Sequence, residues 1–526
     1  MHQFIAQHQE QIVGVLSGFD RVVFRGTLRP IAYAEGMRRY LRATHVLLKD
    51  FGRHVEEVSN RLKEASLAQA QALGRPVTYL ASSQTDKDAL VRRIMAADGI
   101  TRGLVGVLSC VEPCQSFEMR RDRDTQKLVV ETRYRKCLFL YHYWVHPVLG
   151  FMNARIQTWF PFAIQVCLNG REWLARQLEA TGLRYVRRDN CFPWVEDWAT
   201  AQRLLDRQVR AHWPKLLDSI ARQLNPIHAA LFRAYPLHYY WSTYQSEWAT
   251  DLVFRDAAPL RRLYPRLLHH AVTTFGSADV MRFLGRRLLL SGNVPPRFAG
   301  EAVSALKQRE EGIRIKHSVN GNAVKLYDKA YTPVGNVLRA EATLNNVADL
   351  RVYRPKEGDP DGALAWRVMR RGIADLHRRT EVSRKATERY LDALAGVDDD
   401  TTLDELLHRL GRPTQWHGRR VRAFRPFGAD DRALLAAVSR GEFTLNGFRN
   451  RDLQRLFFAH PTTTRHEGRR RSARVSRQLR LLRAHGLIRK LPGTHRYQVT
   501  TSGRKAITAL LSALRATVRQ LTPVAA

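Results

Sequence analysis

The stretch "IKHSVNGNAVKLYDKAYTPVGNVLRAEATLN" at residues 315–345 constrains the fold more than any other part of the chain. Polar and apolar residues alternate on both sides of Asn320-Gly321, and such alternation is typical of strands with one side on a core. Asn-Gly is a preferred pair for the two-residue turn of a hairpin. The pattern therefore predicts an antiparallel meander with strands at 312–319, 323–329 and 337–344.

The polar side of this meander carries an unusual set of charges. Alternation places Lys325 and Tyr327 on the side opposite Val324 and Leu326. Such a side could contact a phosphodiester backbone, or it could be a solvent-exposed ladder of cross-strand charge pairs with a structural role alone. The candidate backbone contacts here are Arg314, Lys316, Lys325 and Arg339.

The same strands offer candidates for catalysis. "KLYDK" followed by "LRAEATL" resembles a segment of the replication initiators of rolling-circle plasmids and filamentous phages, in which a Tyr-x-Lys strand precedes an Arg-x-Glu strand. The residue types on this face are themselves suited to such chemistry, because a metal held by Glu341 or Asp328 could present Tyr327 as a nucleophile. The chain departs from the pattern because no two histidines are separated by one residue, so the His-hydrophobe-His metal motif is missing.

Composition points to a polyanionic partner. The 526 residues include 44% apolar residues, which is enough for several packed cores, and carry a formal net charge of +37. A surplus of this size favours nucleic acid as the partner. We found no apolar run of about 18 residues and therefore expect no membrane segment. Five cysteines without a CxxC pair indicate neither zinc nor disulfides, so we expect a cytoplasmic protein.

The chain as a whole reads as a helix-rich, multidomain α+β protein. Changes in pattern and turn-rich breaks suggest five regions. They are a mixed α/β domain at 1–170, a mainly helical region at 171–310, the meander at 311–355, a basic helical region and linker at 356–426, and a C-terminal module at 427–526.

The C-terminal module has the clearest motif. Three helical segments precede a hairpin and a last helix, and "LRLLRAHGLIRKLPGTHRYQVTTSGR" resembles the winged helix-turn-helix of MarR-like and ArsR-like bacterial regulators. In the third helix Val475, Leu479 and Leu482 share one side, which leaves a basic side free to enter a groove. A solvated basic helix beside an ordinary hairpin is the alternative. The predicted contacts are Arg470, Arg474, Ser476, Arg477 and Arg480 on the helix, with Arg489, Lys490, His495 and Arg496 around the hairpin tip.

Standard signatures of chemistry are absent, including GxxxxGK, HExxH and GxSxG. Acidic residues on apolar strands could converge to hold metal ions, and we name Asp20, Glu247 and Asp251 as candidate ligands. His142 and His146 sit among aromatic residues, which favours packing in a strand over metal binding. Aromatic segments such as "LHYYWSTYQSEW" could stack bases or form core.

The leading hypothesis is a DNA-binding protein of a mobile-element, replication or recombination system, with duplex DNA as its main partner. A metal-dependent nickase, nuclease or strand-transfer enzyme is one alternative, and it would need a divalent cation such as Mg²⁺. An RNA-binding scaffold is the other, because net charge does not distinguish DNA from RNA.

Overall fold

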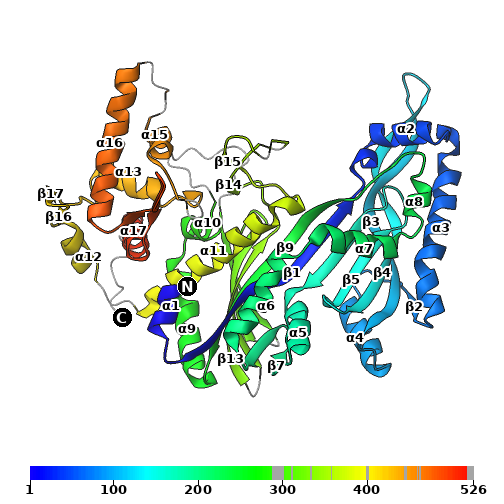
Figure 1. Cartoon of the computed structure of the whole chain (residues 1–526), viewed down its shortest axis with the longest axis horizontal. Helices are drawn as coiled ribbons and strands as arrows, with labels where there is room; N and C mark the ends of the chain where they lie inside the picture. Colours follow the sequence, from blue (N-terminus) through cyan, green and yellow to red (C-terminus); the bar gives the residue numbers. More distant parts are fainter. Residues whose placement is uncertain are drawn as a thin grey trace. The chain divides into compact units, whose positions relative to one another are not determined.

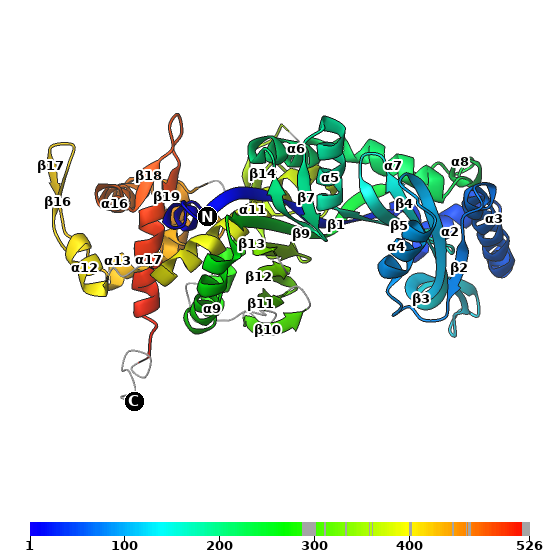
Figure 2. The same cartoon turned by 90° about the horizontal axis from the view of Figure 1, so that it is seen from below.

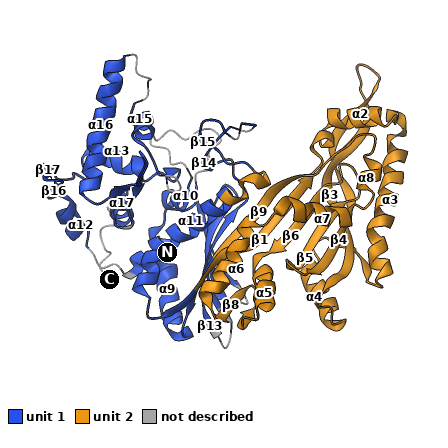
Figure 3. Ribbon diagram, in the orientation of Figure 1, with its two compact units in different colours: residues 1–14, 250–370, 378–526 blue, residues 15–249, 371–377 orange. Residues whose placement is uncertain are grey.

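The computed structural model describes residues 1–286, 301–309, 312–331, 334–356, 358–359, 361–398, 402–443, 447–458, 460 and 464–517. Helix exceeds strand, at 43% against 31%, as expected for a helix-rich α+β protein. The chain divides into two compact units (Figure 3): unit 1 comprises residues 1–14, 250–370 and 378–526, and unit 2 comprises residues 15–249 and 371–377. The five regions suggested by the sequence stay predictions.

A mixed sheet of 11 strands runs in the order β10-β11-β12-β13-β9-β1-β6-β5-β4-β3-β2 (Figure 1). Strands β1 (Ile12–Thr27) and β9 (Tyr240–Phe254) are long, and each contributes residues to both units. The sequence analysis places β9 inside a mainly helical region. Its run of Tyr, Trp and Thr residues explains the strand, because aromatic and β-branched side chains pack well on a pleated surface.

Helices cover both faces of the sheet in unit 2. Helix α3 (Phe51–Ala72) shares a core with Val107, whereas α4 (Lys87–Ala97) shares another with Leu108. Successive strand residues point to opposite faces, so the two helices lie on opposite faces of β3. The strands here are β2 (Val77–Leu80), β3 (Gly103–Arg121), β4 (Leu128–His146), β5 (Gly150–Gln157) and β6 (Ile164–Asn169). The other elements are α2 (Ala34–Ala43), α5 (Gly170–Thr181), α6 (Trp198–Arg210), α7 (Trp213–Leu224), α8 (His228–Leu231), the hairpin of β7 (Tyr185–Arg188) and β8 (Cys191–Val195), and 3-10 turns at Arg29–Ile31, Leu48–Asp50 and Ile373–Asp375.

Strand β6 leads directly into α5. Asn169 is the N-cap of α5, and its side chain accepts hydrogen bonds from the backbone N–H groups of Arg171 and Glu172. A Cβ atom on Gly170 would lie 1.9 Å from the carbonyl oxygen of Phe19. Only glycine therefore fits where this helix begins.

The predicted meander is confirmed in unit 1. Strands β11 (Gly312–Val319), β12 (Asn322–Tyr331) and β13 (Val334–Leu344) pair antiparallel, and β10 (Val303–Arg309) extends them. Asn320 and Gly321 both have positive φ, at 46° and 78°, as a type I′ turn requires. Helix α9 (Ala257–Thr274) packs on β12 and β13 (Figure 2), and its Tyr264 hydroxyl donates to the carbonyl oxygen of Leu326.

Unit 1 also contains a small second hairpin. The region 356–426, expected to be basic and helical, includes a strand, β15 (Ala365–Val368), which pairs with β14 (Arg351–Arg354). The remaining elements in this part are α1 (His2–Gln7), α10 (Ser277–Phe283), α11 (Leu376–Leu394) and a 3-10 turn at Ala395–Asp398.

The C-terminal part of unit 1 follows the predicted order of three helices, a hairpin and a last helix. These are α13 (Ala429–Val438), α15 (Asn450–Phe457), α16 (Arg465–Ala484), β18 (Ile488–Lys490), β19 (Tyr497–Val499) and α17 (Thr501–Ala513). They share one apolar core with α12 (Leu403–Leu410), which begins with a capping box of Thr402 and Glu405. A small hairpin of β16 (Thr414–Trp416) and β17 (Arg419–Val421) follows α12.

The described helices were also compared with the length and hydropathy of a bilayer span. None of them has a stretch long and apolar enough to cross a membrane. The expected cytoplasmic location stays a prediction.

Candidate nucleic-acid interface and candidate metal site

Helix α16 has one buried side and one basic side. Val475, Leu479 and Leu482 are buried in the core shared with α13 and α17. The predicted contacts on the other side are all exposed, namely Arg470, Arg474, Ser476, Arg477 and Arg480.

The exposed arginines of α16 differ in whether another side chain forms an ion pair or hydrogen bond with them. Arg474 lies 3.6 Å from the Asp430 carboxylate in an exposed ion pair. Within the described part of the chain, Arg470, Arg477 and Arg480 have no hydrogen-bond or ion-pair partner. Their guanidinium groups are therefore available to an external anion.

The hairpin of β18 and β19 adds further positive charge. Arg489, Lys490 and His495 are exposed, as predicted for its tip. Arg496 is not: it is 8% exposed, its guanidinium lies 4.1 Å from the centre of the Tyr353 ring, and its Nη1 donates to the carbonyl oxygen of Gly447. The expectation of an exposed Arg496 is wrong, because a planar guanidinium gains more by stacking on an aromatic ring here than by facing water.

The charged side of the meander is buried and not solvent-exposed. Arg314 and Lys325 are each 8% exposed, and Arg339 is fully buried. Only Lys316 among the predicted backbone contacts is half-buried. The expectation of an exposed polar face is wrong, because strand alternation tells which residues share a face but not whether that face is covered.

Two ion pairs organise this buried face. Lys325 on β12 stands directly opposite Glu341 on β13, and the two side chains form an ion pair. The Arg339 guanidinium is bidentate on Asp251, with Nε 2.6 Å from Oδ1 and Nη2 2.9 Å from Oδ2. Asp251, a predicted metal ligand, thus serves as the buried counter-charge of an arginine.

The three predicted catalytic residues lie on different sides of the meander. Tyr327 shares the face of Glu341, and burial together with the negative charge of Glu341 raises the pKa of the Tyr327 hydroxyl. The Arg314 guanidinium, 5.7 Å from the centre of the Tyr327 ring, opposes that rise. Asp328 points to the opposite face, where burial raises its pKa to about 6. Tyr327 and Glu341 therefore share one face of the meander, and Asp328 lies on the other.

Two of the three predicted metal ligands come together in unit 2. Carboxylate oxygens of Asp20 on β1 and Glu247 on β9 lie within 4.8 Å of each other. Asp20 is buried, and the Asn190 amide donates to both of its oxygens at 3.1 and 3.0 Å. Mg²⁺ is commonly bound by one or two protein carboxylates, with water and substrate phosphates as the other ligands. The pair has the donor chemistry of such a site.

A polar pocket of about 230 Å³ opens on the sheet of unit 2. Tyr134 and Tyr244 line it and are 83% and 46% exposed, so their rings are accessible to a stacking partner. Exposed aromatic rings beside arginines are typical of surfaces that bind single-stranded nucleic acid. The polar and aromatic lining comprises Arg25, Gln115, Tyr134, Phe139, Arg155, Gln157, Gln165 and Tyr244.

The histidines of "YHYWVH" serve packing, as predicted. His142 is buried, its ring stacks on Trp144 at 5.5 Å, and burial lowers its pKa to about 4. The Nδ1 atom of His146 accepts hydrogen bonds from the backbone N–H groups of Val148 and Leu149. Among the described residues, neither ring belongs to a cluster of potential metal ligands.

The sequence analysis missed two groups of residues. One is the lining of the unit 2 pocket, for which only the aromatic segment around Tyr244 gave a signal. The other is a set of arginines, Arg282, Arg389 and Arg504, that line a second pocket within unit 1. No local pattern could have joined residues so far apart in sequence.

Comparison with known proteins adds no relative to this picture. The chain matches no family model, no curated protein and no solved structure. The resemblances to winged-helix regulators and to rolling-circle initiators stay predictions, and the functional argument depends on the geometry alone.

Proposed function

We propose that this protein binds nucleic acid, with duplex DNA as its main ligand, through the C-terminal part of unit 1. The observation that carries the proposal is the row of exposed arginines on α16, three of which have no partner within the described residues. We call this set, together with the hairpin cations, the basic surface. Its members are Arg470, Arg474, Arg477, Arg480, Arg489, Lys490 and His495.

The proposed binding mode is that of a winged helix. The buried side of α16 fixes the helix on its core, so that its basic side can enter the major groove, which is wide enough for one helix. The exposed cations of the hairpin then meet the phosphate backbone. The net charge of +37 supports long-range attraction of any nucleic acid to the chain.

A salt titration of duplex binding tests this mode. In the variant Arg477→Ala with Arg480→Ala, two phosphate-binding charges are lost. We expect weaker binding, and a slope of log affinity against log salt that is shallower by about 1 to 2, since each phosphate contact contributes about 0.9. Fluorescence anisotropy of a labelled duplex at several salt concentrations measures both quantities.

A matched control exists in unit 2. Arg207 and Arg210 lie at the end of α6, are exposed, and have the same spacing along a helix as Arg477 and Arg480. Replacing both with alanine removes the same charge and should leave the slope almost unchanged. Equal effects of the two double variants would reject α16 as the groove-binding helix and leave only non-specific charge attraction.

A second candidate function is metal-dependent cleavage or nicking of DNA, favoured by the proximity of Asp20 and Glu247. A divalent cation there would be held by these two carboxylates, with the Asn190 amide holding Asp20 in position. When bound, such a cation supplies Lewis-acid stabilisation of phosphate oxygens. Tyr327 and Glu341 stay the predicted residues for the strand-cleaving step.

Metal binding and cleavage can be tested separately. We expect Asp20→Asn and Glu247→Gln each to weaken Mn²⁺ binding, measured by electron paramagnetic resonance of the free ion, because each removes an anionic ligand. Nicking of supercoiled DNA with Mg²⁺ or Mn²⁺ is then assayed for both variants and for Tyr327→Phe and Glu341→Gln. Unchanged Mn²⁺ affinity in both carboxylate variants would remove the metal site.

The unit 2 pocket provides a test for the kind of strand that binds. Tyr134→Ala with Tyr244→Ala should weaken single-stranded binding more than duplex binding, because stacking on a ring requires an unpaired base. Competition among duplex DNA, single-stranded DNA and RNA at fixed salt measures the preference. A preference for RNA would replace the leading proposal with the RNA-binding one.

A further inference from the structure

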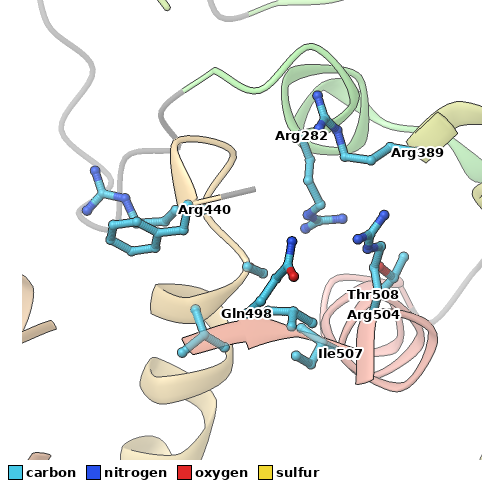
Figure 4. Close-up of a pocket in the computed structure, with 11 residues that line it drawn as sticks. Arg282, Arg389, Arg440, Gln498, Arg504, Ile507 and Thr508 are labelled. Atoms are coloured by element: carbon cyan, nitrogen blue, oxygen red, sulfur yellow. The ribbon is translucent and has the colours of Figure 1, made fainter. Parts of the chain in front are cut away.

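Unit 1 contains a small pocket at which arginines from three helices converge. Arg282 comes from α10, Arg389 from α11 and Arg504 from α17, and the cavity has a volume of about 40 Å³. Figure 4 shows the guanidinium groups of Arg282 and Arg504 turned toward a common space, with the Gln498 amide and Thr508 beside them. Arg440, which also lines the pocket, points away from that space.

Several donors of these arginines are buried without a protein partner. Among the described residues, the Nε and Nη2 atoms of Arg282 and the Nη1 atom of Arg389 have no hydrogen-bond acceptor. The other donors are occupied: Arg282 Nη1 donates to Asp279 at 2.8 Å, and Arg389 Nε donates to the carbonyl oxygen of Phe283 at 2.8 Å. Buried N–H groups of a charged side chain are costly to leave without an acceptor, so these donors favour a ligand that supplies oxygen atoms.

The local charge balance also favours an anion. Burial and the neighbouring positive charge of Arg504 together lower the pKa of Arg389 to about 9, against the opposing effect of Glu388. Burial likewise lowers the pKa of Arg282, which Asp279 opposes and Arg515 reinforces.

The neighbouring carboxylates do not balance the positive charge of these arginines. Asp279 contacts only one edge of Arg282, and Asp392 lies 3.8 Å from Arg504 while it also pairs with the amino group of Met1. A ligand with negative charge would offset the cost of burying these cations.

We propose that this pocket binds a phosphate group, held by Arg282 and Arg504, with Arg389 adding positive charge on the wall of the pocket. Guanidinium forks match the oxygens of phosphate, and two forks from different helices, α10 and α17, can bind different edges of a tetrahedral group. Arg504 is 31% exposed, so the pocket is open to solvent on its side, and the phosphate can be free or the end of a larger molecule. The proposal stands apart from the basic surface, because none of its residues belongs to that surface.

Thermal unfolding of the full chain in sodium phosphate, against sodium chloride at equal ionic strength, tests the site. We expect phosphate to raise the melting temperature, because a ligand that binds the folded state stabilises it. Arg504→Gln should weaken phosphate binding about tenfold or more, because it removes hydrogen bonds to a charged group. Arg432→Gln, an exposed arginine on α13, is the matched control and should keep the wild-type affinity.

A second variant guards against a general loss of stability. Arg282→Lys keeps the positive charge beside Asp279 but removes the fork, and it should weaken phosphate binding while the protein still unfolds cooperatively. The proposal is overturned if phosphate stabilises no more than chloride and 5′-phosphorylated DNA shows no advantage over its 5′-hydroxyl form. It is also overturned if Arg504→Gln and Arg432→Gln reduce binding equally.

The source of the phosphate follows from three probes: inorganic phosphate, an oligonucleotide with a 5′-phosphate, and the same oligonucleotide with a 5′-hydroxyl. If Arg504→Gln abolishes a preference for the phosphorylated oligonucleotide, the ligand is a strand end. If only the response to inorganic phosphate is lost, the ligand is free phosphate. Arg477→Ala with Arg480→Ala should leave phosphate binding intact, so failure of the DNA-binding proposal is distinguishable from failure of this one.

Discussion

Replacing Asp251 with asparagine should destabilise unit 1 rather than abolish metal binding. The carboxylate and the Arg339 guanidinium are 1% and 0% exposed, so the variant leaves a buried cation without its bidentate counter-charge. Removal of one partner from such a pair typically costs about 3–5 kcal/mol. For a folding unit of this size about 2 °C corresponds to each kcal/mol, which predicts a fall in melting temperature of about 6–10 °C.

A double-mutant cycle gives the decisive measurement. The free energies of unfolding of Asp251→Asn, Arg339→Gln and the double variant are obtained by urea denaturation. We expect the double variant to lose less than the sum of the two single losses, by about 1–3 kcal/mol, because the residues act as one pair.

The control is an ion pair on the surface of the same unit. Asp430 is 82% exposed in its pair with Arg474, and Asp430→Asn should change stability by less than about 1 kcal/mol. The reasoning is refuted if Asp251→Asn unfolds like the wild type and instead loses affinity for Mn²⁺, because Asp251 would then be a metal ligand after all.

Three further variants test local features of unit 1, all by urea denaturation. Burial raises the pKa of the Asp328 carboxyl to about 6 from an ordinary value of 3.8, so the folded state binds this proton more tightly than the unfolded state. The free energy of unfolding should therefore fall by about 1–2 kcal/mol as pH rises from about 4 to about 6. Asp328→Asn should remove this pH dependence. Thr402→Ala should cost about 1 kcal/mol, because it removes the hydroxyl that caps α12. Gly447→Ala should cost at least about 1 kcal/mol, because φ is +62° and the new Cβ would lie 2.3 Å from the carbonyl oxygen of Tyr497. Unchanged stability in either of the last two, or an unchanged pH profile in the first, would contradict the corresponding contact.

Features that depend on neighbours in the sequence were predictable. Asn320-Gly321 fixed a hairpin because two adjacent residues with positive φ require that pair or one like it. The spacing of Val475, Leu479 and Leu482 identified the buried side of α16, because helical periodicity acts over a few residues. The capping box at Thr402 is equally local.

Features that depend on distant parts of the chain were not predictable. Lys325 and Arg339 look like surface cations in sequence, and their pairing with Glu341 and Asp251 offsets the cost of burying them. Asp20 and Glu247 were identified as acidic residues on strands, but strand order decides that these two meet. The phosphate pocket is the extreme case, since its arginines come from three helices and each is more than a hundred residues from the next in sequence.

The discontinuity of unit 1 has a consequence for biosynthesis. Its first 14 residues are made before unit 2, yet α1 belongs with segments that begin at residue 250, and the Met1 amino group donates to the carbonyl oxygen of Glu388. At about 5–20 residues per second, the ribosome needs roughly twenty seconds to more than a minute to reach that partner. Residues 15–249 can begin to fold in this interval. The side chain of Phe4, which is buried in the folded protein, stays exposed until a chaperone binds it or the rest of unit 1 is synthesised.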